Sequence, residues 1–262
     1  MYLRTVHAES RIPALRDLIR SYPLGVLTTA IPSSTEPFIQ ATHIPWLLDV
    51  QDESSETELG VLRGHLARQN PHSKVMIESV SSSSNNNNNN ATNTNVLEQD
   101  VLVLFTATPS HYVTPQFYTE TKPSTGKVVP TWNYAAVQAY GKARIYYDSK
   151  SDETSHFLTR QITDLTNHTE ISIMDYTGQN GRPDQWNVTD APDRYIELLK
   201  KNIIGIEISI DKLQGKFKMS QEMSKGDRDG VVQGFATLES DVARAVSEVV
   251  QERSEMREAA KR

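Results

Sequence analysis

Between Pro23 and Pro32 the chain carries the run Leu24-Gly25-Val26-Leu27-Thr28-Thr29-Ala30. Apolar and β-branched residues bounded by turn formers are typical of a β-strand. Comparable runs predict further strands at residues 38–48, 60–64, 74–79, 101–107, 137–147 and 203–210. Strands at this short spacing, without a helix between each pair, favour an antiparallel barrel or sandwich over a doubly wound sheet.

Helices are predicted at the start of the chain and in its second half. Apolar residues recur at helical spacing in residues 12–22 and 151–167. The sequence Asp190-Ala191-Pro192-Asp193 has the cap and the proline of a helix start. From Gly226 onward we expect helix, and the charged end from Glu252 to Arg262 is expected to project or fray. We therefore predict one domain over residues 1–236, followed by a helical tail over residues 237–262.

One segment has the composition of a disordered loop. Four serines, Ser81 to Ser84, precede six asparagines, Asn85 to Asn90. Such a tract has no apolar surface whose burial could offset the entropy lost on ordering. We expect residues 79–99 to form a disordered surface loop.

Composition excludes several classes of protein. The 262 residues include no cysteine, which excludes a disulfide framework, thiolate metal sites and a Cys nucleophile. No apolar run is long enough to span a membrane, and the N-terminus lacks the apolar core of a secretory signal. A cytoplasmic protein is expected, with a nuclear location left open. The 33 acidic against 27 basic residues give a net charge of -6, and no DNA-binding motif is present, so direct DNA binding is doubtful.

Three segments carry candidate binding chemistry. Residues 61–71 form an apolar strand that ends in Arg-Gly-His and turns into a short helix start, and they hold two arginines and a histidine. These residues suit a phosphate, although a solvated basic turn has the same composition. In residues 127–134 two aromatic residues flank an amide. This arrangement indicates either a planar binding slot or an ordinary core tryptophan beside a strand start. In residues 213–221 two lysines share one face of a strand, which also describes an edge strand protected against aggregation.

Other motifs are missing. The seven histidines form no metal-binding spacing, so we expect no metal site. The chain also lacks a nucleophile elbow, a P-loop and a dinucleotide-binding glycine pattern.

Taken together and in this order, the three segments resemble the signature stretches of the PaiB-type FMN-binding negative transcriptional regulators. Further matches are Met1-Tyr2, residues 41–45, residues 110–115 and Trp186-Asn187-Val188. The resemblance extends from residue 1 to about residue 235. It implies a mainly β (α+β) fold, the FMN-binding split β-barrel of flavin reductases and pyridoxamine-phosphate oxidases, with peripheral helices. It also implies a homodimer with FMN at the subunit interface.

The resemblance also implies roles for individual residues. The flavin phosphate is expected near the turn that follows the second hairpin, and the ring system along residues 41–45. Segments of the partner subunit are expected to close the site. The implied cofactor-binding residues are Thr42, His43, Ile44, Arg63, Gly64, His65, Ala67, Arg68, Asn70, Trp132, Asn133, Tyr134, Lys216, Lys218 and Ser220. Three positions depart from the family pattern, with Phe217 for Trp, Met219 for Leu and Glu222 for Asn.

Two classes of function follow from the resemblance, and a third stays open. The first is a flavin-dependent oxidoreductase that acts on a small molecule. The second is a non-enzymatic FMN-binding transcriptional regulator, and the third is a haem-binding or haem-processing protein that uses the same slot. His111 is a candidate for contact with the substrate or for its protonation, and a structural hydrogen bond to a loop carbonyl is its alternative.

Overall fold

The computed structural model describes residues 1–86 and 95–260. The chain forms two compact units, each built from separate stretches of sequence. The barrel unit comprises Pro23–Leu104 and Ala139–Lys212, and the terminal unit comprises Met1–Tyr22, Phe105–Gln138 and Leu213–Arg262. Two long strands, β8 (Thr131–Tyr146) and β9 (Ile203–Lys218), contribute residues to both.

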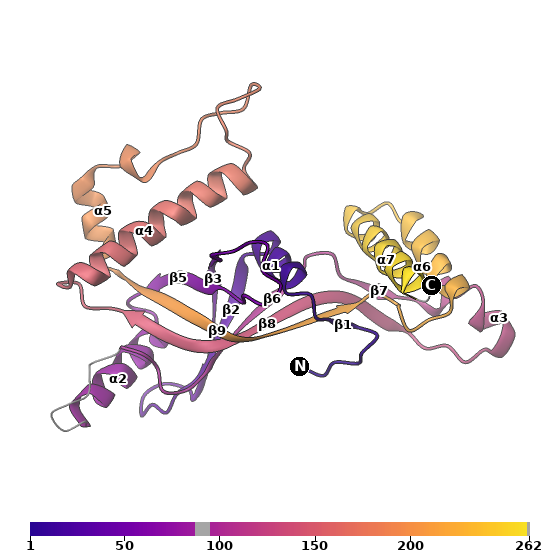
Figure 1. Ribbon diagram of the computed structural model, residues 1–262, viewed down its shortest axis with the longest axis horizontal. Helices are drawn as coiled ribbons and strands as arrows, with labels where there is room; N and C mark the ends of the chain where they lie inside the picture. Colours follow the sequence, from indigo (N-terminus) through magenta and orange to yellow (C-terminus); the bar gives the residue numbers. More distant parts are fainter. Residues whose placement is uncertain (87–94, 261–262) are drawn as a thin grey trace. The chain divides into compact units, whose positions relative to one another are not determined.

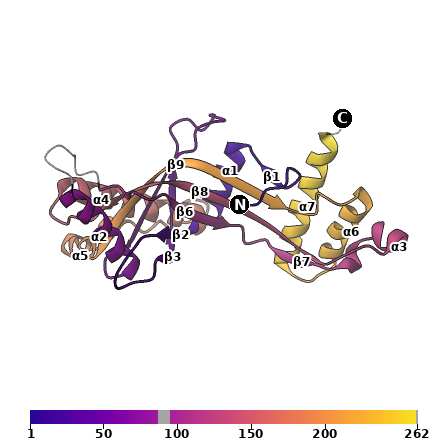
Figure 2. The same cartoon turned by 90° about the horizontal axis from the view of Figure 1, so that it is seen from below.

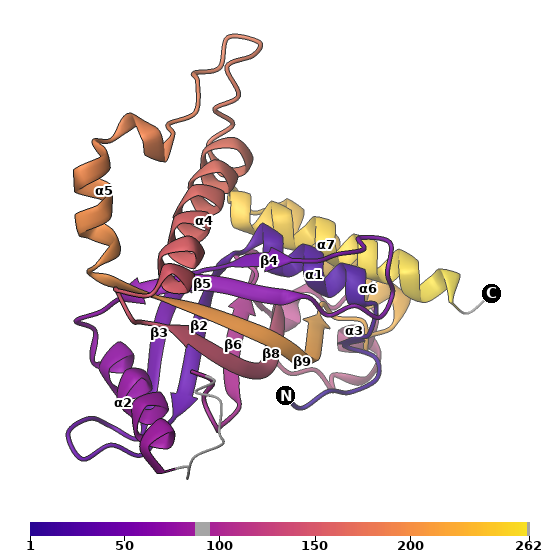
Figure 3. The ribbon, with the colours of Figure 1, turned by 60° about the vertical axis from the view of Figure 1, so that its left-hand side comes forward.

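An antiparallel sheet forms the centre of the barrel unit. Its strand order is β3-β2-β6-β8-β9-β5-β4, and every described register is antiparallel. The sheet is visibly curled (Figure 3), as the predicted antiparallel barrel requires, and the fold class expected from the sequence is confirmed. Besides β8 and β9, its strands are β2 (Leu24–Ala30), β3 (Ile39–Pro45), β4 (Leu47–Asp49), β5 (Val61–Ala67) and β6 (Val101–Thr106).

Alternation of side chains along the strands builds the core of this unit. In β2, every second residue is buried, because successive side chains of a strand point to opposite faces of the sheet. Three isoleucines of β9, Ile204, Ile206 and Ile208, are fully buried. Between the first two, Gly205 leaves room for the ring of Phe157, which a β-carbon there would approach to 2.4 Å.

The helices of the barrel unit are α2 (Pro71–Asn86), α4 (Asp152–His168) and α5 (Asp193–Lys200), with a π-helical turn over Thr169–Ile173 and a 3-10 turn over Val188–Asp190. Helix α2 corrects the sequence analysis, which predicted a strand at residues 74–79. The side chain of Asn70 accepts a hydrogen bond from the backbone N–H of His72 at 2.9 Å and so caps the helix start. Val75, Met76 and Val80 are buried together, and this spacing suits a helix face.

Helix α2 also extends into the stretch for which a disordered loop was predicted, residues 79–99. Its last residue is Asn86, and residues 87–94 of that prediction lie outside the described residues. Beyond them, Val96 forms a β-bridge with Arg144, and Leu97 is only 1% exposed. The end of the predicted loop is therefore anchored in the barrel unit by a buried leucine.

The terminal unit contains α1 (Ile12–Ser21), β1 (Ala8–Glu9), β7 (His111–Val113), a 3-10 turn (Pro115–Phe117), α3 (Thr121–Thr125), α6 (Lys225–Ala236) and α7 (Asp241–Ala259). Helices α6 and α7 lie side by side in this unit (Figures 1 and 2). Phe235 of α6 and Val246 and Val250 of α7 have no exposed surface. The C-terminal helix thus packs on its own unit, and the expectation that its charged end projects or frays is wrong, because Arg253 pairs with buried Glu9 at 2.6 Å.

Among the described residues, no helix combines the length and apolar character needed to cross a membrane. Within the same part of the chain, no three His, Asp or Glu side chains are grouped as metal ligands.

Candidate functional site

The predicted cofactor-binding residues fall into two groups, one in each unit. The barrel-unit group comprises residues of β3, β5 and the turn into α2, namely Thr42, His43, Ile44, Arg63, Gly64, His65, Ala67, Arg68 and Asn70. The terminal-unit group comprises residues of β8, of β9 and of the turn that follows it, namely Trp132, Asn133, Tyr134, Lys216, Lys218 and Ser220. Each group is described by itself.

Arg63 is held inside the barrel unit by two carboxylates. It lies 2.5 Å from Asp49 and 2.8 Å from Asp164, and its own side chain is 3% exposed. A further hydrogen bond reaches Gln161. Burial lowers the pKa of Arg63, but the two carboxylates outweigh this effect and raise it. The guanidinium charge is already neutralised, so Arg63 has a structural role here in place of the predicted phosphate contact.

Two further residues of the predicted set, Ile44 and Gly64, lie in the interior. Ile44 is 1% exposed. A β-carbon at Gly64 would lie 3.0 Å from both Ile44 and Trp46. Because Gly64 has no side chain, β5 can pack closely against these two residues. Ile44 and Gly64 form part of the core of the barrel unit.

His65 lies on the opposite face of β5 from Gly64, since side chains alternate along a strand. It borders a cavity of about 280 Å3 whose wall includes Ile162, Trp186 and Ile196. Its Nδ1 is buried without a hydrogen-bond partner, and burial lowers its pKa. His65 therefore has unused hydrogen-bonding capacity at a buried ring nitrogen.

Arg68 differs from Arg63 in its partners. Its guanidinium donates to two backbone carbonyls, those of Lys201 and Tyr147, and within the described residues no carboxylate pairs with it. It lies just before Asn70 and the start of α2. Positive charge at a helix N-terminus suits a phosphate group.

The sequence analysis missed a contact between strand β3 and a histidine of helix α2. His72 of α2 is buried between two hydroxyls, with Nε2 2.8 Å from Thr29 and Nδ1 2.9 Å from Thr42. Burial lowers its pKa to about 4. The hydroxyl of Thr42, predicted to face the flavin, is thus engaged by His72, whereas His43 and Ala67 are exposed. No motif marks His72, and its only sequence signal is its place after Asn70-Pro71.

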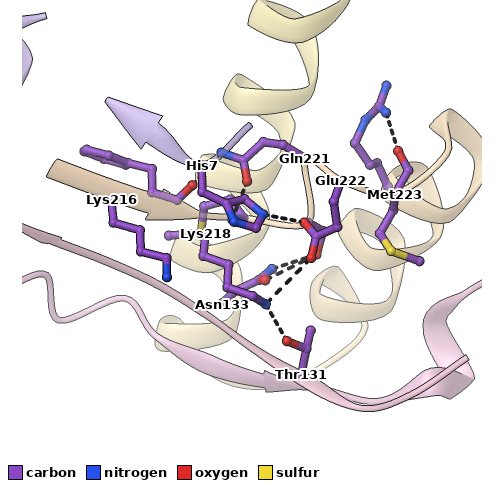
Figure 4. Close-up of polar contacts among 12 residues, drawn as sticks. His7, Thr131, Asn133, Lys216, Lys218, Gln221, Glu222 and Met223 are labelled. Carbon is purple, nitrogen blue, oxygen red and sulfur yellow. Dashed lines mark hydrogen bonds and ion pairs between the residues drawn. The ribbon is translucent and has the colours of Figure 1, made fainter. Parts of the chain in front are cut away.

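The terminal-unit group contains two lysines, Lys216 and Lys218 (Figure 4), and Lys216 lies beside two aromatic rings. The Nζ atom of Lys216 lies 5.8 Å from the ring centre of Tyr2 and 5.6 Å from that of Tyr134. It donates to the backbone carbonyl of Tyr2 at 3.2 Å. No carboxylate among the described residues pairs with Lys216, and its contacts there are a carbonyl oxygen and two ring faces.

Lys218 belongs to a chain of polar contacts in the same unit (Figure 4). Its Nζ donates to Thr131 and to the carbonyl of Trp132, and Glu222 lies 3.8 Å away. Burial lowers the pKa of Lys218, the charge of Glu222 partly opposes this shift, and Lys216 adds to the lowering. Glu222 also lies 2.8 Å from buried His7. Burial raises the pKa of Glu222, but hydrogen bonds and the charges of His7 and Lys218 together outweigh it, and the pKa lies below its usual value.

Asn133 and Ser220 form a buried pair. The amide nitrogen of Asn133 and the hydroxyl of Ser220 are 3.1 Å apart, and both residues are 0% exposed. Ser220 adopts a left-handed backbone conformation with φ of 62°, which is strained for a residue with a side chain. The contact with Asn133 holds this turn at the end of β9. Trp132 is 52% exposed on the neighbouring strand face.

His111 makes two contacts within the terminal unit. Its Nδ1 lies 2.7 Å from the backbone carbonyl of its neighbour Tyr112. Its ring contacts the edge of Phe235 at a centroid distance of 5.2 Å. These contacts favour the structural interpretation of His111 over the catalytic one.

Comparison with known proteins identifies the family. Residues 1–212 match the family described as "Putative FMN-binding domain". The chain belongs to this FMN-binding family. An uncharacterized protein of Emericella nidulans is 57% identical over 98% of this chain and 99% of its own. The protease synthase and sporulation protein PAI 2 of Bacillus subtilis is 27% identical over 81% of this chain and 80% of that protein. The solved flavocytochrome Anf3 of Azotobacter vinelandii is similar over 82% of this chain and 72% of its own, with a TM-score of 0.44 and 11% identity.

FMN is the cofactor that this family assigns to the chain. Its phosphate requires cations, and its ring system requires flat surfaces with polar groups nearby. Arg68 and Lys216 meet these needs, because neither is neutralised by a carboxylate of the described residues. His65 adds a buried nitrogen without a partner. Arg63, Gly64 and Ile44 lie in the interior of the barrel unit, and their contact with FMN stays a prediction.

Proposed function

We propose that the protein is an FMN-dependent oxidoreductase that acts on a small molecule. The observation that supports this most directly is the placement of Lys216 between the rings of Tyr2 and Tyr134, without a carboxylate partner in the described residues. Bound FMN supplies hydride and electron transfer. The protein supplies positive charge beside aromatic surfaces, and this charge stabilises a cofactor that has gained electrons.

In this proposal Arg68 and the N-terminus of α2 bind the phosphate group. Arg68 is held in place by the carbonyls of Lys201 and Tyr147, which orient its side chain without neutralising it. A charge-assisted hydrogen bond between guanidinium and phosphate is stronger than one between neutral groups. The N–H groups at the start of α2 add partial positive charge.

Lys218 is the proposed proton donor of the same site. Burial lowers its pKa, which makes release of a proton easier than from an exposed lysine. Glu222, itself bonded to His7, lies 3.8 Å from the ammonium group and orients it. A lysine with a lowered pKa beside a fixed carboxylate suits general acid–base catalysis.

We also propose that the working protein is a homodimer in which one copy supplies the Arg68 group and the second copy supplies the lysine group. Each group alone offers only part of what FMN needs, since the barrel-unit group has the phosphate-type contacts and the terminal-unit group has the aromatic–lysine contacts. Light scattering coupled to size exclusion measures the mass. A monomer that binds one FMN with full affinity would overturn the dimer proposal.

The function is tested with two matched lysine variants. Lys216→Met removes the cation beside Tyr2 and Tyr134, and Lys212→Met removes another lysine of β9, 5.7 Å from the ring of Tyr140. FMN is added to each protein, and oxidation of NADH or NADPH and the midpoint potential of the flavin are measured. We expect activity in the wild type and in Lys212→Met, and a lower potential and slower turnover in Lys216→Met. Bound flavin without any turnover would support the non-enzymatic regulator, and a haem spectrum would contradict FMN.

A further inference from the structure

The terminal unit contains a cavity that the FMN proposal does not use. Its volume is about 330 Å3, within the ~300–1,000 Å3 of small-molecule sites. Helix α1 forms one wall and helix α7 another, and Phe217 and Met219 line it between them. The family match ends at residue 212, so α7, Phe217 and Met219 lie beyond it.

Arg253 is the most buried charged side chain that lines this cavity. Its side chain is 10% exposed, and its Nη1 is 2.6 Å from Glu9. The guanidinium lies 3.8 Å from the ring centre of Phe217, which fixes its plane. Burial raises the pKa of Glu9, but hydrogen bonds from Arg11 and Arg253 outweigh it and lower that pKa to about 2. Glu9 is therefore a permanent anion that holds Arg253 in position.

The hydrogen-bonding capacity of Arg253 is not used up by these contacts. A guanidinium has five N–H donors, and Glu9 accepts from one of them. The Nε atom is buried and has no acceptor. A buried donor without a partner is unfavourable, and a carboxylate bound at the guanidinium would form charge-assisted hydrogen bonds with its remaining donors.

The opposite charge lies at the mouth of the cavity. Asp17 of α1 and Glu252 of α7 line it, and both are exposed. Neither carboxylate has a partner among the described residues. Together with Glu9, Arg11 and Arg253, they leave a net charge of -1 around the cavity, from three carboxylates and two guanidiniums. A simple anion would add to this negative charge. A ligand that also carries a cationic group would neutralise part of the negative charge of Asp17 and Glu252.

Much of the remaining wall of the cavity is apolar. Leu18, Ala135 and Met219 line the cavity and are each at most 5% exposed. A ligand that fills it therefore needs an apolar body, a carboxylate for Arg253 and an ammonium group for Asp17 and Glu252. We infer that this cavity binds a small zwitterion of the apolar α-amino acid class.

Three related probes test this inference on the full-length, FMN-loaded protein. L-Phenylalanine has both charged groups, phenethylamine lacks the carboxylate, and 3-phenylpropionate lacks the ammonium group. We expect saturable binding of L-phenylalanine by calorimetry, one per chain, and about tenfold weaker binding of each analogue. Equal affinity for all three probes, or no saturable binding at about 1 mM L-phenylalanine, would overturn the inference.

Single-residue variants test which side chain binds each charged group of the ligand. Arg253→Gln is expected to weaken L-phenylalanine about tenfold and to leave phenethylamine unchanged. Asp17→Asn is expected to weaken L-phenylalanine and to leave 3-phenylpropionate unchanged. Arg244→Gln removes an exposed arginine of the same helix, outside the cavity, and serves as the control. Unchanged L-phenylalanine binding in Arg253→Gln would contradict the site.

A second kind of variant keeps the test informative if Arg253→Gln does not fold, since Glu9 would lose a partner. Ala14 of α1 lines the cavity and is partly exposed. Ala14→Phe fills the space without changing any charge. We expect the folded variant to lose binding of all three probes while it retains FMN. Unchanged binding in this variant would contradict the cavity as the site.

Discussion

Arg63 of β5 and Asp164 of α4 are joined by a hydrogen bond of 2.8 Å although 101 positions separate them in the chain. Asp49 of β4 binds the same guanidinium. One buried cation thus connects two strands and a helix of the barrel unit. Its two carboxylates are 36% and 40% exposed, so they remain partly solvated.

Arg63→Met is predicted to destabilise the fold. Removal of one partner from a buried ion pair costs about 3–5 kcal/mol, and the partial solvation of Asp49 and Asp164 reduces this to about 2–3 kcal/mol. Arg160 contacts the same two carboxylates but is 62% exposed, and Arg160→Met is expected to cost less than about 1 kcal/mol. Urea unfolding measures both. Equal losses in the two variants would show that burial of Arg63 is not the source of its contribution.

Arg68→Met is predicted to weaken FMN while leaving riboflavin, which lacks the phosphate, unchanged. Loss of a hydrogen bond to a charged group, about 1.5–3 kcal/mol, corresponds to about 10–100-fold in affinity. Flavin fluorescence titrations measure both ligands. Arg182→Met, an exposed arginine paired with Asp175, is the control with the same change of charge. A parallel loss for FMN and riboflavin would mean that Arg68 acts on the fold and not on the phosphate.

Most strands could be predicted from the sequence because β-branched runs bounded by turn formers favour the extended conformation. Residues 24–30 form β2 with the predicted bounds. The failure at residues 74–79 has a physical reason, since a short apolar run suits a buried strand and a helix face equally well. The deciding signal was the cap at Asn70 with Pro71 in the first turn.

The candidate site was predicted less completely than the fold. The Arg63-Gly64-His65 motif shows where cations lie in the chain, but the carboxylate that neutralises Arg63 from α4 is distant in sequence. His7 and Glu222 meet only in the folded terminal unit. Charge pairing between distant segments depends on the fold, and residue patterns alone do not reveal it.

His72 is predicted to make the protein sensitive to acid. Its pKa is about 4 in the fold against a usual value of 6.5, so the unfolded chain binds more protons between these two values. The free energy of unfolding therefore falls as pH decreases from about 6.5 to about 4, by at most about 3 kcal/mol.

The acid sensitivity is checked by urea unfolding at several pH values. His72→Gln removes the titrating group, and the dependence on pH in this window should become shallower, although His65, whose pKa is also lowered, retains its share. His156 is exposed, and His156→Gln should leave the dependence as in the wild type. The same slope in all three proteins would contradict the role of His72.

Val246 and Val242 provide a last test, because they lie one turn apart on α7 in opposite environments. Val246 is 0% exposed, and Val242 is 40% exposed. Val246→Asp would bury a carboxylate against α6 and is expected to lower the free energy of unfolding by at least about 4 kcal/mol. Val242→Asp lies in the first turn, where a negative charge is favourable, and should change it by less than about 0.5 kcal/mol. Thermal and urea unfolding measure both variants. If they unfolded at the same midpoint, the packing of Val246 against α6 would contribute nothing to stability.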